Sequence, residues 1–171
     1  MQEQPSVART ALKYGIIVAV GVIIYSTVLT IADLTQNQAL SSLAFVILIA
    51  GMVWAMRDFR TRNDGFMSYG QGLGIGSLMS AIVGLLGSVF SMFYMTFIDT
   101  NLIKKSMDAT REKLEKQGMD DAQIDQAIQM TEKFMTPGMM FVIGVLTYVV
   151  IGFIASLIVS AIMRRNRPVF E

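Results

Sequence analysis

The sequence contains neither cysteine nor histidine among its 171 residues. The chain therefore has no disulfide and no thiol nucleophile, and it cannot build a Ser/His or Cys/His catalytic pair or a zinc or haem site through those side chains. Charge is also scarce, because Lys, Arg, Asp and Glu make up 16% of the residues and the formal net charge is only +1. Nucleic-acid binding requires a stronger basic field, so we expect no nucleic-acid partner.

Apolar residues are abundant instead. Hydrophobic residues make up 53% of the chain and the mean hydropathy is +0.54, which is typical of a membrane protein. Four long segments contain no charged residue, and a helix needs about 20 apolar residues to cross the hydrocarbon layer. The sequence thus predicts an all-α, polytopic fold, a single membrane domain over residues 1–171. The expected spans are residues 14–32, 40–56, 69–98 and 137–163.

The basic residues near the spans predict the orientation of the chain. Arg9 and Lys13 precede the first span, and the connection between the first two spans has no Lys or Arg. By the positive-inside rule, we expect both termini to lie in the cytoplasm and residues 99–136 to lie outside. The other topology determinants follow the second and fourth spans: Arg57, Arg60, Arg62, Arg164, Arg165 and Arg167.

The first span also has some features of a cleaved signal peptide. It has a basic flank, and Thr30, Ile31 and Ala32 weakly resemble a cleavage site. However, its apolar run exceeds the usual 7–15 residues of a signal peptide. Cleavage would leave three spans and disturb the charge pattern, so we expect the segment to remain as a span.

The loop between the third and fourth spans predicts an outer helical hairpin over about residues 100–135. Gly118 ends the first helix, and Pro137 fits the first turn of the last span. The expected caps are Asn101 or Thr100 for the first helix and a capping box of Asp120 with Gln123 for the second.

Each helix of this hairpin carries an apolar stripe. Isolated helices of this length are marginal in water, so we expect the stripes to face each other or the membrane surface. The stripe residues are Ile103, Met107 and Leu114 on the first helix, and Ile124, Ala127, Ile128, Thr131 and Met135 on the second.

Glycine is concentrated in the stretch "GFMSYGQGLGIGSLMSAIVGLLGS". A phosphate-binding loop would need G-x-G-x-x-G or G-x-x-x-x-G-K-[ST], but Ile75 stands where the third glycine belongs after Gly70 and Gly72, and no lysine follows. Small residues every four positions instead predict a helix-packing ridge. The ridge residues are Gly72, Gly76, Ser80, Gly84 and Ser88, with Gly152, Ser156 and Ser160 on the last span.

Three stretches together resemble a known family. They are "RNDGFMSYGQGLGIGSLMSAIVGLLGSVFSMFYMTFIDTNLI", "LEKQGMDDAQIDQA" and "KFMTPG". The chain resembles, over nearly its whole length, the domain of unknown function 4199, a family of four-pass membrane proteins found mainly in Bacteroidetes. That family often has proline after the aspartate of "FID", where this chain has Thr100. The resemblance implies a bacterial inner-membrane protein and supplies no substrate, cofactor or catalytic residue.

Three ligand hypotheses compete with simpler explanations. Three aspartates could suggest calcium, but the EF-hand order is absent and helix capping explains them better. The "RDFRTR" cluster could bind anionic lipid, although topology explains it without a ligand. Clustered methionines could suit Cu(I), although Met is also a flexible apolar filler. The residues concerned are Asp120, Asp121 and Asp125 for calcium, and Met92, Met95, Met135, Met139 and Met140 for copper.

No span contains a charged residue, and the serines of the third span have no base partner. We therefore expect no enzyme activity, no catalytic residue, no cofactor and no metal site. The favoured function is a packing or interaction module that associates with itself or with another membrane protein in the bilayer. The alternative is a small oligomeric transporter or channel component, which would need a water-accessible path to Gln71, Ser77, Ser80 and Thr147.

Overall fold

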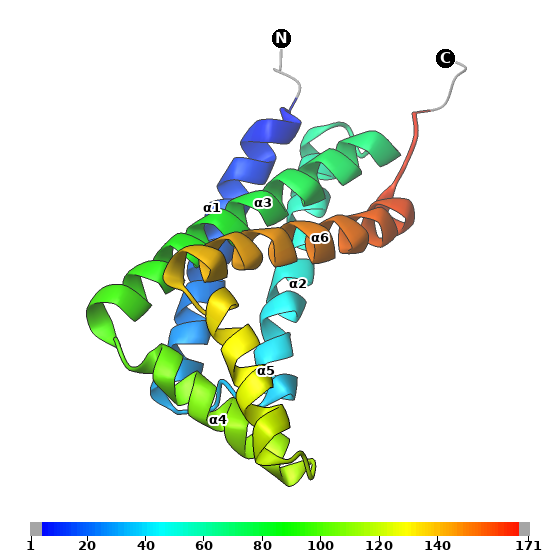
Figure 1. Cartoon of the computed structure of the whole chain (residues 1–171). Helices are drawn as coiled ribbons and strands as arrows, with labels where there is room; N and C mark the ends of the chain where they lie inside the picture. Colours follow the sequence, from blue (N-terminus) through cyan, green and yellow to red (C-terminus); the bar gives the residue numbers. More distant parts are fainter. Residues whose placement is uncertain (1–4, 168–171) are drawn as a thin grey trace. The chain divides into compact units, whose positions relative to one another are not determined.

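The computed structural model describes residues 5–167, which form helices joined by short connections (Figure 1). The predicted all-α fold is confirmed for these residues. Residues 1–4 and 168–171 lie outside the described residues. The predicted cytoplasmic position of the two chain ends concerns these residues. The elements are α1 (Val7–Ile31), α2 (Gln38–Arg62), α3 (Tyr69–Phe93), the π-helical turn η1 (Tyr94–Ile98), α4 (Leu102–Lys116), α5 (Asp121–Phe134) and α6 (Pro137–Met163).

Four of these helices are long and apolar enough to cross a membrane. α1 and α2 have 25 residues each, α6 has 27, and α3 with η1 has 30. A rise of about 1.5 Å per residue gives the shorter helices a length of about 37 Å, which exceeds a hydrocarbon layer of about 30 Å. The chain is thus a multi-pass membrane protein. The prediction of four spanning-type helices is confirmed. α1 begins before residue 14, and α2 extends beyond residues 40–56, because their polar flanks continue the helices.

Local sequence explains where the spans begin and turn. Asn37 caps α2, because its side-chain oxygen accepts hydrogen bonds from the backbone N–H groups of Ala39 and Leu40. After α2 the chain reverses through Asp64 and Gly65, which both have positive φ (55° and 83°). Two successive positive φ values are typical of a tight turn built on an Asp-Gly pair.

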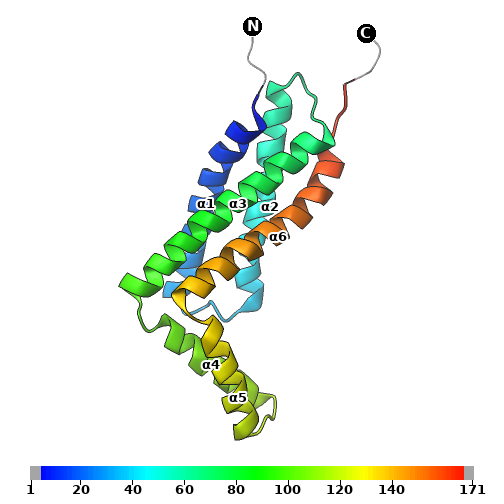
Figure 2. The ribbon, with the colours of Figure 1, turned by 45° about the horizontal axis from the view of Figure 1, so that its top comes forward.

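The chain divides into two compact units, of which the first runs to Gly87 and resumes at Val145. It holds α1, α2 and most of α3 and α6, and Figure 2 shows their ribbons alongside one another. Its core is a cluster of buried side chains in which methionine is prominent. The fully buried members include Leu48, Met52, Met56, Phe59, Ile75 and Met79.

The second unit is Ser88–Gly144 and contains the helical pair α4 and α5 (Figure 2). Gly118, with φ +80°, follows α4, and the predicted capping box begins α5. Asp120 accepts a hydrogen bond from the Gln123 backbone, and the Gln123 side chain accepts one from the Asp120 backbone. Asn101 stands at the N-cap of α4 as predicted, but its side chain makes no capping hydrogen bond.

Candidate functional site

The small residues of α3 face small residues of α6. A methyl group added to Gly76 would overlap the Ser156 side chain, and one added to Gly152 would overlap that of Ser80. These backbones therefore approach so closely that glycine is needed at one side of each contact. The facing pairs, at four-residue steps along two antiparallel helices, are Gly72 with Ser160, Gly76 with Ser156, Ser80 with Gly152, Gly84 with Tyr148, and, in the second unit, Ser88 with Gly144.

Serine hydroxyls in this contact bond mainly within their own helices. Ser80 donates to the Gly76 carbonyl (2.7 Å), and Ser156 donates to the Phe153 carbonyl (2.8 Å). The Ser77 and Ser156 hydroxyls lie 3.4 Å apart and link the two helices. Ser160 is the exception, since its buried hydroxyl has no hydrogen-bond partner among the described residues. The contact is thus a packed one whose polar atoms are mostly satisfied locally.

Two glycines outside the predicted ridge also permit close helix contacts. A methyl group on Gly51 of α2 would overlap Val18 of α1 and would lie 3.1 Å from Met79 of α3. One on Gly15 of α1 would lie 3.0 Å from Ile82 of α3. Isolated glycines give no four-residue pattern, so sequence reasoning did not select them.

Gly144 is a further residue that sequence reasoning missed. It lies eight residues before Gly152, so it continues the four-residue spacing of α6. The bulky Tyr148 stands between them and hides the pattern. In the structure, Tyr148 packs its ring against Phe45 at 5.3 Å between centroids, and the opposite position on α3 is Gly84, which leaves room for the larger residue.

The C-terminal ends of α2 and α6 meet at one end of the first unit. Met67 and Arg165 exchange two backbone hydrogen bonds, of 2.9 and 2.8 Å. Arg60 donates to the Met163 carbonyl (3.5 Å). Arg62 donates to Thr10 (3.1 Å), so the start of α1 lies at the same end as the C-terminal ends of α2 and α6. These bonds and the Asp64–Arg167 ion pair place four of the six predicted topology determinants, Arg60, Arg62, Arg165 and Arg167, at this end. Arg57 lies in the last turns of α2, and Arg164 directly follows α6.

A surface cleft of about 280 Å³ lies at this basic end. Phe66 forms its apolar part, with the guanidinium groups of Arg165 and Arg167 at 5.9 and 5.8 Å from the ring centroid. Asp64 forms an ion pair with Arg167 (3.0 Å). Asn63 is buried and donates to the Phe66 carbonyl (2.8 Å), which fixes the loop. The remaining lining residues are Met67, Ser68, Gln71 and Asn166.

The α4–α5 hairpin has one fully buried side chain and ion pairs on its surface. Ile124 is fully buried, whereas the other predicted stripe residues are partly buried. Arg111 of α4 pairs with Asp125 of α5 (2.6 Å), and this hydrogen bond raises the pKa of Arg111. Within α4, a hydrogen bond from Lys116 (2.6 Å) lowers the pKa of Glu112. Both pairs are exposed, so their contribution to stability is small.

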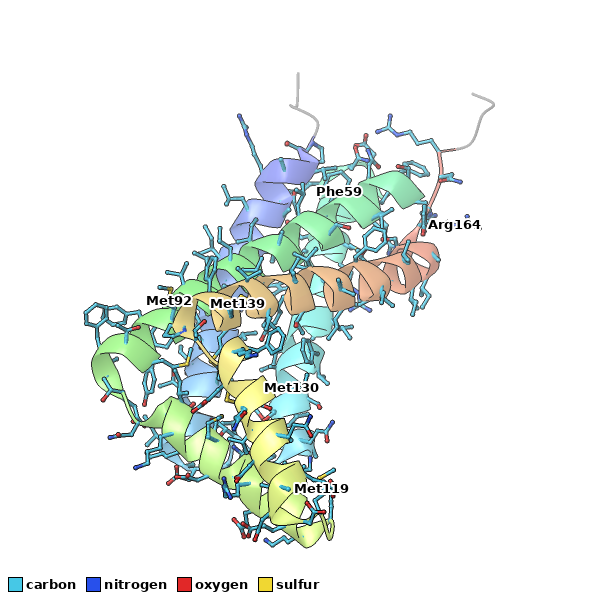
Figure 3. All side chains as sticks on the ribbon, viewed as in Figure 1. Phe59, Met92, Met119, Met130, Met139 and Arg164 are labelled. Carbon is cyan, nitrogen blue, oxygen red and sulfur yellow. The ribbon has the colours of Figure 1, made fainter. Side chains whose placement is uncertain are left out.

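The structure shows where several of the residues considered as calcium or copper ligands lie. Asp120 caps α5 and Asp125 pairs with Arg111. No group of three or more candidate His, Cys, Asp or Glu metal ligands occurs in the described part of the chain, residues 5–167. Of the methionines, Met95 is buried, while Met92 and Met139, labelled in Figure 3, stay exposed.

The fold and the packed contact define a class: an all-helical, multi-pass membrane protein with close small-residue packing between two spans. The chain matches the model of a family described as protein of unknown function (DUF4199) over residues 13–165. The match covers most of the chain, so the protein belongs to this family, as the sequence motifs predict. Searches of curated proteins and of solved structures find no match.

Proposed function

We propose that this protein is a non-enzymatic packing module of a bacterial inner membrane that associates with a second copy of itself or with another membrane protein. The α3–α6 contact carries the proposal. Ser80, Ser156 and Ser160 are fully buried in it, and two of these hydroxyls bond to carbonyls of their own helix. This burial supports a packed contact. Of the four polar groups named for a solute path, Ser80 is buried, Gln71 and Ser77 are half-buried, and Thr147 is exposed.

The hairpin offers a surface for such an association. Met130 and Phe134 lie one helical turn apart on α5, with exposed fractions of 61% and 52% (Met130 is labelled in Figure 3). Neighbouring exposed apolar side chains are typical of a contact site. The same hairpin also carries the exposed Arg111–Asp125 and Glu112–Lys116 ion pairs.

A transporter or channel component is the second candidate, and one observation favours it. A cleft of about 170 Å³ in the first unit, near the α1–α2 connection, is lined by hydroxyl-bearing side chains together with the apolar Leu29, Ala44 and Phe45. Polar groups on spanning helices are candidates for a solute path. The lining residues include Ser26, Thr30, Ser41 and Tyr148.

The proposal includes the orientation of the chain in the membrane. Arg62 bonds to Thr10, and Arg165 bonds to Met67, at the basic end of the first unit, where the described residues include eight Lys or Arg against two Asp. The positive-inside rule assigns that end to the cytoplasm and the α4–α5 hairpin to the outer side.

Co-purification tests this function. We expect the full chain, purified in mild detergent, to retain a second copy or a specific membrane protein, identified by mass spectrometry. Met130→Ser should weaken that association, whereas Gln129→Ser, an exposed polar neighbour, should not. A chain that purifies alone and conducts a solute in reconstituted vesicles would contradict the module and favour the transporter.

A further inference from the structure

The basic end of the first unit has more positive charge than its own carboxylates neutralise. Asp58 pairs with Arg62 and Asp64 with Arg167. These are the only two Asp or Glu residues against eight Lys or Arg in the described part of this end. Such an excess of positive charge attracts anions. Because spanning helices end here, the excess charge lies at the level of the lipid headgroups.

Within this end, the cleft places two guanidinium groups close to one aromatic ring. Arg165 has no carboxylate partner among the described residues, and its backbone is fixed by the two hydrogen bonds to Met67. Its guanidinium and that of Arg167 lie within 6 Å of the Phe66 ring centroid. With Asp64 opposing one of the two cations, the cleft has one positive charge in excess, which matches the single negative charge of a phosphodiester.

We propose that this cleft, formed by Asn63, Phe66, Ser68 and residues 165–167, binds the phosphate group of an anionic phospholipid. Arg165 donates a pair of hydrogen bonds to the phosphate oxygens, since the planar guanidinium matches them in geometry. Ser68 and Asn166, which also line the cleft, add neutral donors. This inference does not depend on the proposed packing function.

A lipid titration tests the proposal. The delipidated full chain, in an uncharged detergent, is titrated separately with phosphatidylglycerol, phosphatidylcholine, phosphatidylethanolamine and inorganic phosphate, and bound lipid is measured by native mass spectrometry. We expect phosphatidylglycerol to bind at least about tenfold more tightly than either zwitterionic lipid. Equal binding of the three lipids, or displacement of phosphatidylglycerol by an equal concentration of inorganic phosphate, would overturn the proposal.

Matched variants distinguish binding in the cleft from general electrostatic attraction of the lipid to the basic end. Arg165→Gln should weaken phosphatidylglycerol binding about tenfold, because a charge-assisted hydrogen-bond pair is lost. Arg57→Gln removes the same charge at the same end but outside the cleft, so it should change binding less than about twofold. Equal losses in the two variants would contradict the proposal. Arg165→Lys keeps the charge and should lose an intermediate amount of phosphatidylglycerol affinity. This variant provides the comparison if Arg165→Gln fails to fold. Wild-type affinity in Arg165→Lys would contradict the paired hydrogen bonds.

Discussion

At the scale of single residues, the packing of α3 against α6 depends on which glycines have a neighbour. Gly76 and Gly87 both lie in α3, but only Gly76 faces another helix at close range. A methyl group on Gly76 would overlap Ser156 and would lie 2.9 Å from the Met52 sulfur. A methyl group on Gly87 would have no neighbour within 4 Å among the described residues. The two glycines are therefore a matched pair for mutagenesis.

Gly76→Ala should destabilise the protein by about 1–3 kcal/mol, because the added methyl group forces the helices apart. Gly87→Ala should be neutral or stabilising by up to about 1 kcal/mol, because alanine is the better helix former. Thermal aggregation of each purified variant in detergent measures the difference. Equal midpoints for the two variants would show that α3 and α6 do not pack as closely as the structure indicates.

Ser160 provides a second test at the residue scale. Its hydroxyl is buried without a partner and faces Gly72. Ser160→Ala removes an unsatisfied polar atom, so the midpoint of thermal aggregation should stay the same or rise by the equivalent of about 1 kcal/mol. Ser160→Val adds a larger, branched side chain at the same contact and should lower the midpoint of thermal aggregation. A clear loss of stability in Ser160→Ala would mean that the hydroxyl makes a stabilising hydrogen bond in the purified protein, and would contradict the unpartnered contact.

At the scale of elements, the hairpin is stabilised mainly by its single fully buried side chain. Ile124 lies on α5, whose N-terminus is fixed by the capping box, while the α4–α5 ion pair is exposed. Burial of a large apolar side chain contributes about 1.5–3 kcal/mol, whereas an exposed ion pair contributes much less. The hairpin therefore depends on apolar contact.

Ile124→Asp should destabilise the hairpin, because it places a charge in that contact. Gln129→Asp introduces the same negative charge at an exposed position of α5 and should leave the hairpin intact. Hydrogen exchange of residues 102–134 is the measurement. We expect loss of protection in the first variant only, and an unprotected hairpin in the wild type would refute the helical pair itself.

The elements could be predicted from sequence, but not their partners. Charge-free runs, the Asp120 capping box and Pro137 are local signals, so the positions of the helices follow from them. The pairing of Gly84 with Tyr148 is not local, because it depends on two helices being in one register. Sequence analysis for this reason selected the eight small residues of the ridge but missed Gly144, and no pattern of spacing marks Gly15 or Gly51. The cleft at Phe66 likewise arises only when residues about a hundred positions apart form hydrogen bonds.

At the scale of the whole molecule, the four spans and the distribution of charge determine the proposed orientation. The chain has no native cysteine, so a single introduced thiol can be labelled without background. In intact spheroplasts, a membrane-impermeant maleimide should label a cysteine replacing Lys113 in α4 and should not label one replacing Arg60 at the basic end. The reverse pattern would invert the orientation.

The central claim is that the polar groups between the spans are packed in a dry contact. Cysteine accessibility at Ser156, which is fully buried, tests it most directly. In native membranes, Ser156→Cys should resist a small, water-soluble thiosulfonate reagent and should react fully after denaturation. Lys113→Cys, at an exposed site, provides the reference rate. The account predicts that Ser156→Cys reacts at least about a hundredfold more slowly than this reference, since opening the contact exposes buried surface. Comparable rates at the two positions would reveal a water-filled path between the spans and would contradict the account.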